Sequence, residues 1–352
     1  MKSKPLSASK IKTLQTCSWQ YWCKYGPLKL PDTSNDGSKR GSICHLVFEV
    51  LGRKGREHLF NNILSKKDVF CEPSIKRLIM KHAVRESVDD DENVLSMKEM
   101  ILNGLFYDFF GDTHCSPEKH ESELAFTIQK DDGEFKYSVR GFIDKLFLYK
   151  EEKYALIRDF KSSKKAFNSY EVDDNLQDLM YSLAVKKLFP EYENRQSEFL
   201  FLKFELDSSQ KHCKEESSIN SGVVKMAAIS DYELMGFEHF LTEIQGLVDN
   251  FTEEDAQANM AHAKGYPKPE EGFAGKIVCG FAKFKGQLKK DGNVMWHCPF
   301  KFGFDYFVAL DEKEVIIKSA HKREDLLEFE KVEKRKYAGC PAFNLDDDSD
   351  LL

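Results

Sequence analysis

The sequence is poor in the residues that mark fibrous, disordered or disulfide-stapled chains. It has 10 prolines and 20 glycines in 352 residues, with 41% hydrophobic and 32% charged residues, which excludes a collagen-like or wholly disordered chain. Its nine cysteines are odd in number and include no CxxC pair, so they do not form the disulfide framework of a small secreted protein. This length predicts one large core or two modest domains.

Long apolar segments are also missing. No run approaches the roughly 18 to 20 apolar residues that a membrane span requires, and the start, Met1-Lys2-Ser3-Lys4-Pro5, leads into no apolar signal segment. We therefore expect a cytoplasmic protein without a membrane partner, or one in the host-cell cytoplasm if its source is a virus.

Basic residues are fewer than acidic ones: the sequence has 52 Lys and Arg against 59 Asp and Glu, which gives a net charge of -7. Evenly spread, this balance would argue against a nucleic-acid partner. The signs are segregated, however. Residues 261–300 carry seven lysines and three acidic residues, a local charge of +4, whereas acids cluster at 89–92 and at the C-terminus. The net charge therefore does not exclude a nucleic-acid partner.

Apolar spacing predicts helices first and strands later. A helix of about five turns is expected from Ser7 to the stop at Gly26-Pro27, and a second over 43–51, followed by a broken helical pattern. From about residue 122 the pattern alternates. It predicts a hairpin that turns at Asp132-Gly133, then a more central strand at 154–157, a helix near 176–185 and a buried strand at 199–204. This order predicts an α/β (α+β) fold.

Two carboxylates fall at neighbouring strand ends. Asp144 closes the segment Gly141-Phe142-Ile143-Asp144, and Asp159-Phe160-Lys161 follows 15 residues later. Because adjacent strands lie about 5 Å apart, both carboxylates can converge on one divalent cation, with Lys161 on the same side as Asp159. Such a set suits phosphodiester hydrolysis, since the cation neutralises charge on a phosphate and the lysine orients or deprotonates water. A strand ending in D-x-K can also be surface charge.

Five segments in order resemble one family. They are Leu14 to Trp22 (L-x-x-C-S-x-x-Y, with Ser18 at a usual proline), Arg40 to His45 (R-G-x-x-x-H), Gly141 to Asp144 (G-x-x-D), Asp159 to Lys161 (D-x-K) and Gln177 to Tyr181 (Q-x-x-x-Y). The sequence thereby resembles the PD-(D/E)XK nucleases, and among them the RecB-like clade with its AddB-like and CRISPR-adaptation exonucleases. The resemblance implies a restriction-endonuclease-like core, with a small mixed sheet flanked by helices.

The resemblance also implies site residues. Asp144 and Asp159 would bind Mg²⁺ or Mn²⁺ with the backbone carbonyl of Phe160, and Lys161 would be the catalytic lysine. His45 would approach the metal; its alternative is a hydrogen-bonded core histidine. Gln177 would fix the lysine or bind substrate, Tyr181 would contact DNA or pack in the core, and Glu123 would be a further acid near the site. Substrate contacts are also expected from Arg40, Lys164 and Lys165.

The cysteines could suggest another site, because several relatives hold an iron–sulfur cluster with one early and three late cysteines. Cys17, Cys279 and Cys298 match this pattern with one late cysteine missing, and Cys340 could replace it only from a distance of 41 residues. We therefore expect these cysteines to pack as apolar residues rather than to hold a cluster.

Two charged segments lie outside the matched half of the chain. The lysines Lys283, Lys285, Lys289 and Lys290, interleaved with Phe281 and Phe284, suit a nucleic-acid groove or a solvated hairpin with core phenylalanines. The acidic residues 345–352 are expected to be disordered, and they either keep the protein soluble or bind a basic partner. We divide the chain into a helical part (1–120), a core sheet with its motif helix (121–206), a helical and basic extension packing on the core (207–344) and this tail.

The sequence thus predicts a metal-dependent DNA nuclease, in the form of an exonuclease by family analogy, acting in recombination, repair or degradation. Its partners would be single-stranded DNA or duplex ends. The motif GxxxxGK[ST] is absent, so unwinding would need a separate helicase, and a recombinase or single-strand-binding protein is a further expected partner. The alternatives are an inactive nuclease-fold subunit that binds DNA or a partner, and an inhibitor acting through the acidic surface.

Overall fold

The computed structural model describes residues 4–31, 35–113, 115–163, 167, 175–204, 222–261 and 278–343. The chain forms two compact units. The first contains residues 1–8 and 34–245, and the second contains residues 9–33 and 246–352. Among the described residues, no helix has the length and apolar character needed to cross a membrane.

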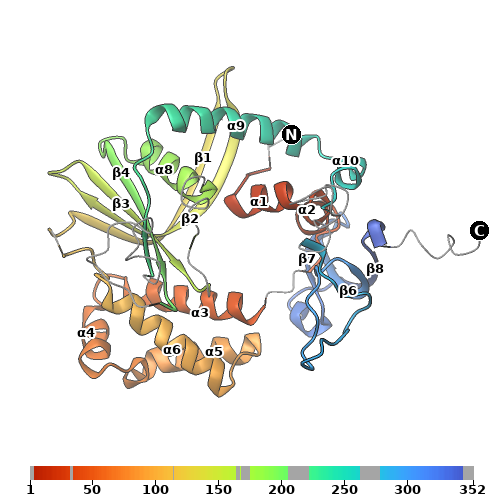
Figure 1. Ribbon diagram of the computed structural model, residues 1–352, viewed down its shortest axis with the longest axis horizontal. Coiled ribbons are helices and arrows are strands. Elements are labelled where there is room, and N and C mark those ends of the chain that lie inside the picture. Colours follow the sequence, from red (N-terminus) through yellow and green to blue (C-terminus); the bar gives the residue numbers. More distant parts are fainter. Residues whose placement is uncertain are drawn as a thin grey trace, which may run out of the picture. The chain divides into compact units, whose positions relative to one another are not determined.

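A five-stranded mixed sheet is the centre of the first unit (Figure 1). Its strands are β1 (Lys119–Asp131), β2 (Lys136–Tyr149), β3 (Tyr154–Lys161), β4 (Asn194–Phe201) and β5 (Val223–Lys225), in that spatial order. All neighbours are antiparallel except β3 and β4, which are parallel and joined through helix α8 (Leu176–Leu188). The strand order confirms the predicted hairpin and the central place of the strand at 154–157.

Helices cover one face of this sheet with the main apolar core. They are α3 (Asp36–Leu51), α4 (Glu57–Lys66), η1 (Val69–Cys71), α5 (Pro73–Glu86) and α6 (Asp91–Phe106). Phe48 of α3 packs on Phe160 of β3, with their ring centroids 4.2 Å apart. Because successive strand residues point to opposite faces, Asp159 then projects to the other face, where α8 lies. One strand thus contributes to the core and to the site.

Side-chain caps fix where the helices that carry the site begin. Asn35 caps α3 by accepting a hydrogen bond from the backbone N–H of Ser38 at 2.9 Å. Asn175 caps α8 by accepting from the N–H groups of Gln177 and Asp178 at 3.0 and 3.1 Å. Each cap satisfies donors that a helix leaves unpaired, which stabilises the helix by about 1 kcal/mol.

The predicted N-terminal helix is divided in the structure. Helices α1 (Ala8–Thr16) and α2 (Ser18–Tyr25) are separated at Cys17, whose backbone is extended. Tertiary contacts within the second unit hold the break: Ser18 Oγ donates to the carbonyl of Ala256 at 2.7 Å, and the thiol of Cys17 accepts from the N–H of Ala261 at 3.4 Å. The spacing of apolar residues does not show such contacts between distant segments, so it did not predict the break at Cys17. The predicted end of the helix at Gly26 is confirmed.

The second unit contains strands that the sequence did not predict. Its antiparallel sheet has the order β7 (Ile316–Ala320), β6 (Phe302–Leu310), β8 (Val332–Gly339), and α10 (Glu253–Ala258) precedes it. Short 3₁₀ turns, η4 (Arg323–Leu326) and η5 (Pro341–Phe343), follow β7 and β8. Its core includes Trp19, whose indole N–H donates to Tyr337 Oη at 2.8 Å. Helix α9 (Asp231–Asp249) lies in the first unit up to Gln245, and there Tyr137 of β2 donates to Glu238 at 2.6 Å.

Candidate active site

Strands β2 and β3 bring the two predicted carboxylates together. Lys145 pairs with Arg158 in the antiparallel ladder, so Asp144 and Asp159 are the next cross-strand neighbours. Oδ2 of Asp144 accepts a hydrogen bond from the backbone N–H of Phe160 at 2.8 Å. Both carboxylates are buried, at 8% and 3% exposure. The two strand ends thus lie side by side, and the convergence of both carboxylates on one cation stays a prediction.

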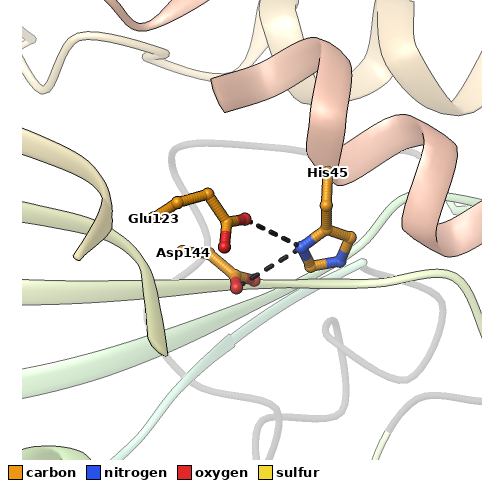
Figure 2. Close-up of side chains that lie close together, drawn as sticks. All are labelled: His45, Glu123 and Asp144. Atoms are coloured by element: carbon orange, nitrogen blue, oxygen red, sulfur yellow. Dashed lines mark ion pairs between the residues drawn. The ribbon is translucent and has the colours of Figure 1, made fainter. Parts of the chain in front are cut away.

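Helix α3 carries His45 to this point because it closely approaches the end of β3. A Cβ at Gly41 would lie 2.6 Å from Oγ of Ser162, so glycine permits the approach. His45 Nε2 lies 3.1 Å from the carbonyl oxygen of Phe160. Its Nδ1 lies 3.3 Å from Oδ1 of Asp144 and 3.5 Å from Oε1 of Glu123, and Figure 2 shows both carboxylates pointing at this nitrogen.

These three side chains form a set that can hold a divalent cation. The ligand atoms of His45, Glu123 and Asp144 all lie within 4.8 Å of one another. Two carboxylates and an imidazole suit Mg²⁺ or a first-row transition metal. Glu123, a supporting acid in the sequence prediction, thus becomes a candidate ligand. Asp159 lies outside this set and the Phe160 carbonyl faces the imidazole of His45, so both stay predicted ligands.

Asp159 also belongs to a hydrogen-bonded network with Lys161, the predicted catalytic lysine. Nζ of Lys161 lies 2.6 Å from Oδ2 of Asp159 and donates to Oε1 of Gln177 at 2.6 Å. Gln177 of α8 donates from Nε2 to Asp159 Oδ1 at 2.6 Å and to the Tyr181 hydroxyl at 2.5 Å. Tyr181 in turn donates to Asp159 Oδ1 at 3.3 Å. The side chain of Tyr181 is buried, at 6% exposure, and its contact with DNA stays a prediction.

Burial and neighbouring charges shift the acidities at the site. Burial, with the negative charge of Asp144, raises the pKa of Asp159 to about 6, although Lys161 opposes the shift. Burial alone would lower the pKa of His45. The charge of Asp144 and hydrogen bonds to Asp144 and Glu123 outweigh burial and raise the pKa well above its usual value. Concentrated negative charge therefore favours a bound cation, either a proton or a metal ion.

Other predicted substrate contacts are less informative. The guanidinium of Arg40 donates to the side-chain carbonyl of Asn93 on α6. Arg40 thereby ties α3 to α6, which leaves its contact with substrate a prediction. Lys164 and Lys165 lie outside the described residues, as does the acidic segment 345–352.

The four candidate cluster cysteines share one apolar core. Cys17, Cys279, Cys298 and Cys340 are all buried in the second unit. Burial raises the pKa of Cys279 to about 12 and that of Cys340 to about 11. Within the described part of the chain, no three of these sulfur atoms lie within 4.8 Å of one another. Sequence spacing did not predict that Cys340 joins the other three.

The lysine segment of the second unit is open to solvent. Phe281 and Phe284 are 59% and 62% exposed, so the alternative of core phenylalanines is wrong. The four lysines between and after them, at 283, 285, 289 and 290, are exposed as well. Exposed aromatic and cationic side chains in alternation are typical of nucleic-acid contacts.

Comparison with known proteins identifies the family. The model of the PD-(D/E)XK nuclease superfamily matches residues 5–265, so the chain belongs to this superfamily. A search of curated proteins found no match. Among solved structures, a protein from Eubacterium rectale that is named provisionally as an exonuclease has a TM-score of 0.41 and 11% identity, over 70% of this chain and 81% of that one. The family match agrees with the resemblance of the five motifs and with the mixed α/β fold.

Proposed function

We propose that this protein is a metal-dependent deoxyribonuclease of RecB-like type that hydrolyses phosphodiester bonds, as an exonuclease in DNA recombination, repair or degradation. One observation carries the proposal: a ligand set of one histidine and two acids adjoins a lysine that is held by Asp159 and Gln177. Metal ligands beside a positioned amine suit hydrolysis of a phosphodiester, and the superfamily is one of nucleases.

Each residue of the site has its own role in the proposed reaction. His45, Glu123 and Asp144 would hold Mg²⁺ or Mn²⁺, which supplies positive charge for the phosphate and lowers the pKa of bound water. Asp159 and Gln177 hold Nζ of Lys161 at one place, where the amine would orient or deprotonate the attacking water. His45 contacts both acids of the ligand set, so it also fixes their orientation.

Digestion of end-labelled DNA tests the proposal. Single-stranded, duplex and circular DNA are incubated with Mg²⁺ and with Mn²⁺, using wild type, Asp144→Asn and Lys161→Met. We expect metal-dependent loss of the linear substrates and survival of the circle. Both variants should lose activity by a factor of about 10² to 10⁴. Asp89→Asn and Lys54→Met are matched controls at exposed positions and should keep wild-type activity.

The same experiment distinguishes the alternatives. Cleavage of the circle by wild type would make the protein an endonuclease and contradict the exonuclease form. DNA binding without cleavage in either metal would favour an inactive nuclease-fold subunit. An inhibitor acting through the acidic tail would lose function when residues 346–352 are deleted, whereas a nuclease should keep its basal activity.

A further inference from the structure

A small cavity lies in the first unit, on the side of strand β3 that faces away from helix α8. Its volume is about 280 Å³, and its lining includes Leu156 and Arg158 of β3 and Glu198 of β4. Arg158 contacts the chain just after α6, whereas its neighbour Asp159 contacts α8. The cavity and the candidate active site therefore lie on opposite faces of one strand. Ligand sites begin at about 300 Å³, so this volume suits one small molecule.

Strand β3 is unevenly buried beside the cavity. It is the central strand of the five-stranded sheet. Ala155 and Ile157, which point to the α8 side, are both fully buried. Tyr154 and Leu156, which line the cavity, are only half-buried. The helices that cover the rest of this face leave these two residues open, so the cavity is accessible from solvent.

Two tyrosines with nearly parallel rings line the cavity. The ring centroids of Tyr149 and Tyr154 are 5.7 Å apart, with an angle of 25° between the ring planes. The hydroxyl of Tyr149 donates to the carbonyl of Gly111 at 2.8 Å, and that of Tyr154 donates to Oε1 of Gln196 at 3.1 Å. These hydrogen bonds hold both rings in place. A planar ligand thus meets aromatic surface that is already ordered, which favours binding.

The guanidinium of Arg158 is a buried donor that is only partly used. Arg158 is 1% exposed, its Nε donates to Oε1 of Glu198 at 2.6 Å, and its Nη1 donates to the backbone carbonyl of Asp108 at 2.6 Å. Within the described part of the chain, Nη2 has no hydrogen bond, and its ion pair with Oδ2 of Asp108 spans 3.7 Å. A buried N–H without an acceptor destabilises a protein. An acceptor atom of a ligand in the cavity would satisfy Nη2.

The charges around the cavity favour a neutral ligand. The charged residues of its lining are Asp108, Glu152, Glu198, Arg158 and Lys225. Three acids and two bases nearly cancel, so the cavity offers neither a phosphate nor a quaternary ammonium group a site of one sign. Donors and acceptors of hydrogen bonds occur together beside aromatic rings. This combination suits a planar, uncharged ring system that carries both kinds of group on one edge.

We infer that the cavity binds a nucleobase, whose ring lies against Tyr149 and Tyr154. An oxygen or nitrogen atom of the base accepts from Nη2 of Arg158, and an N–H of the base donates to Asp108. Enzymes that take up a single base hold it in this way, by stacking and by hydrogen bonds to its edge. The inference does not depend on the proposed nuclease function, because the residues that line the cavity include neither the candidate metal ligands nor Lys161.

Protection of Cys115 from alkylation tests whether the cavity is occupied. This half-buried thiol lines the cavity, whereas Cys71 of η1, also half-buried, does not, so Cys71 is an internal control. Wild type is treated with N-ethylmaleimide in EDTA, with adenosine, guanosine, cytidine or thymidine at millimolar concentration. Mass spectrometry follows each cysteine in its peptide. We expect at least one nucleoside to slow the alkylation of Cys115 severalfold and to leave Cys71 unchanged, and ribose alone to protect neither.

Variants of Tyr154 test the stacking. Calorimetric titration measures the affinity for the nucleoside that protects the thiol. Tyr154→Ala should weaken binding about 5- to 150-fold, whereas Tyr154→Phe keeps the ring and should bind as wild type does. Tyr232→Ala removes an aromatic ring that is 83% exposed on α9 and should also bind as wild type does. Protection of Cys115 in wild type needs no variant, so it tests the inference even if Tyr154→Ala fails to fold.

The same assay identifies the source of the base. Protection by a single-stranded oligonucleotide at a lower concentration than its nucleoside, with no protection by an abasic oligonucleotide, assigns the cavity to a base within a nucleic-acid chain. Protection by nucleosides alone assigns it to a free nucleoside. The inference is overturned if neither class protects Cys115, or if Tyr154→Ala binds the nucleoside as tightly as wild type. The nuclease proposal would stand in both cases, because digestion of DNA is measured separately.

Discussion

Gln177 donates a hydrogen bond from Nε2 to Oδ1 of Asp159 at 2.6 Å, and the carbonyl of the same amide accepts from Nζ of Lys161. One side chain of α8 therefore orients both a carboxylate and the amine that we propose to be catalytic. Truncation in Gln177→Ala should leave Lys161 free to rotate away from the substrate water. We expect the turnover rate to fall about 10- to 100-fold, as for other residues that orient ligands or catalytic groups. Single-turnover cleavage of end-labelled DNA measures this rate.

The matched control for this variant is Gln257→Ala, at an exposed position of α10. Urea unfolding of both variants should show that neither loses much stability. Wild-type turnover in Gln177→Ala would show that Asp159 alone positions the lysine.

Metal binding should be visible as added stability. A cation that binds the folded state at 100 times its dissociation constant stabilises it by about 2.7 kcal/mol. We therefore expect Mn²⁺ to raise the melting temperature of wild type, and His45→Ala and Asp144→Asn to abolish the rise. Glu49→Gln, a change elsewhere on α3, should retain it.

The metal-induced rise should depend on pH in one direction. The pKa of His45 lies well above its usual value, chiefly because the charge of Asp144 overcomes the effect of burial. A proton must leave the imidazole before it binds a metal, so affinity should increase as the pH rises. Calorimetric titration with Mn²⁺ between pH 6 and pH 8 measures this trend. Equal affinity at both ends would remove His45 from the ligand set.

The buried carboxylate of Asp178 should lower the free energy of unfolding at neutral pH. Burial raises its pKa from 3.8 to about 6, although hydrogen bonds from Ser197 and Ser182 oppose the shift. Because the folded state binds the proton more tightly than the unfolded state, stability falls as the pH rises from 3.8 to about 6. The loss is complete above that window and amounts to about 3 kcal/mol. Asp178→Asn should thus stabilise the protein by up to about 3 kcal/mol at pH 8 and by little at pH 4.

Urea unfolding of wild type and Asp178→Asn at both pH values tests this difference. Asp231→Asn, at an exposed carboxylate paired with Lys186, serves as the control and should not stabilise at pH 8. A stabilisation by Asp178→Asn that is equal at both pH values would mean that the charge of Asp178 is not its cause.

The sequence could predict the strand-end part of the site and little of its surroundings. Asp144, Asp159 and Lys161 are separated by a short hairpin, so strand geometry alone brings them together. Glu123 is a candidate ligand because its carboxylate lies 3.5 Å from Nδ1 of His45, and its left-handed backbone within β1 is a local irregularity that the alternating pattern does not predict. His45 reaches the site because Gly41 lets α3 approach Ser162, a contact between distant segments. Local periodicity carries no information on such contacts.

The buried ion pair between Arg158 and Glu198, which sequence patterns do not predict, should matter for stability. Arg158 and Glu198 are 1% and 2% exposed, and Arg158 Nε donates to Glu198 Oε1 at 2.6 Å. Arg158→Met leaves a buried carboxylate without its partner and should cost about 3 to 5 kcal/mol. The double variant Arg158→Met with Glu198→Leu should recover much of this loss. Urea unfolding measures the loss of stability in each single variant and in the double variant. If the loss in the double variant equals the sum of the two single losses, the two side chains act independently.

The buried cysteines of the second unit allow a direct test for an iron–sulfur cluster. Four buried cysteines, Cys17, Cys279, Cys298 and Cys340, share one core, and burial raises the pKa of the thiols of Cys279 and Cys340. The thiol of Cys340 also contacts the sulfur of Met260 at 3.9 Å, as an apolar packing group does. We therefore expect protein purified without oxygen to lack stoichiometric iron and visible absorbance.

Iron analysis and an absorbance spectrum measure both quantities. The comparison is between wild type, Cys279→Ala and Cys71→Ala, the last at a half-buried thiol outside this core. If the thiols only pack, Cys279→Ala should lower stability by about 1 kcal/mol, because one small apolar group is lost from a core. Stoichiometric iron with a visible band that disappears in Cys279→Ala and persists in Cys71→Ala would contradict the packing role. The same four cysteines would then be ligands whose deprotonation is driven by the metal.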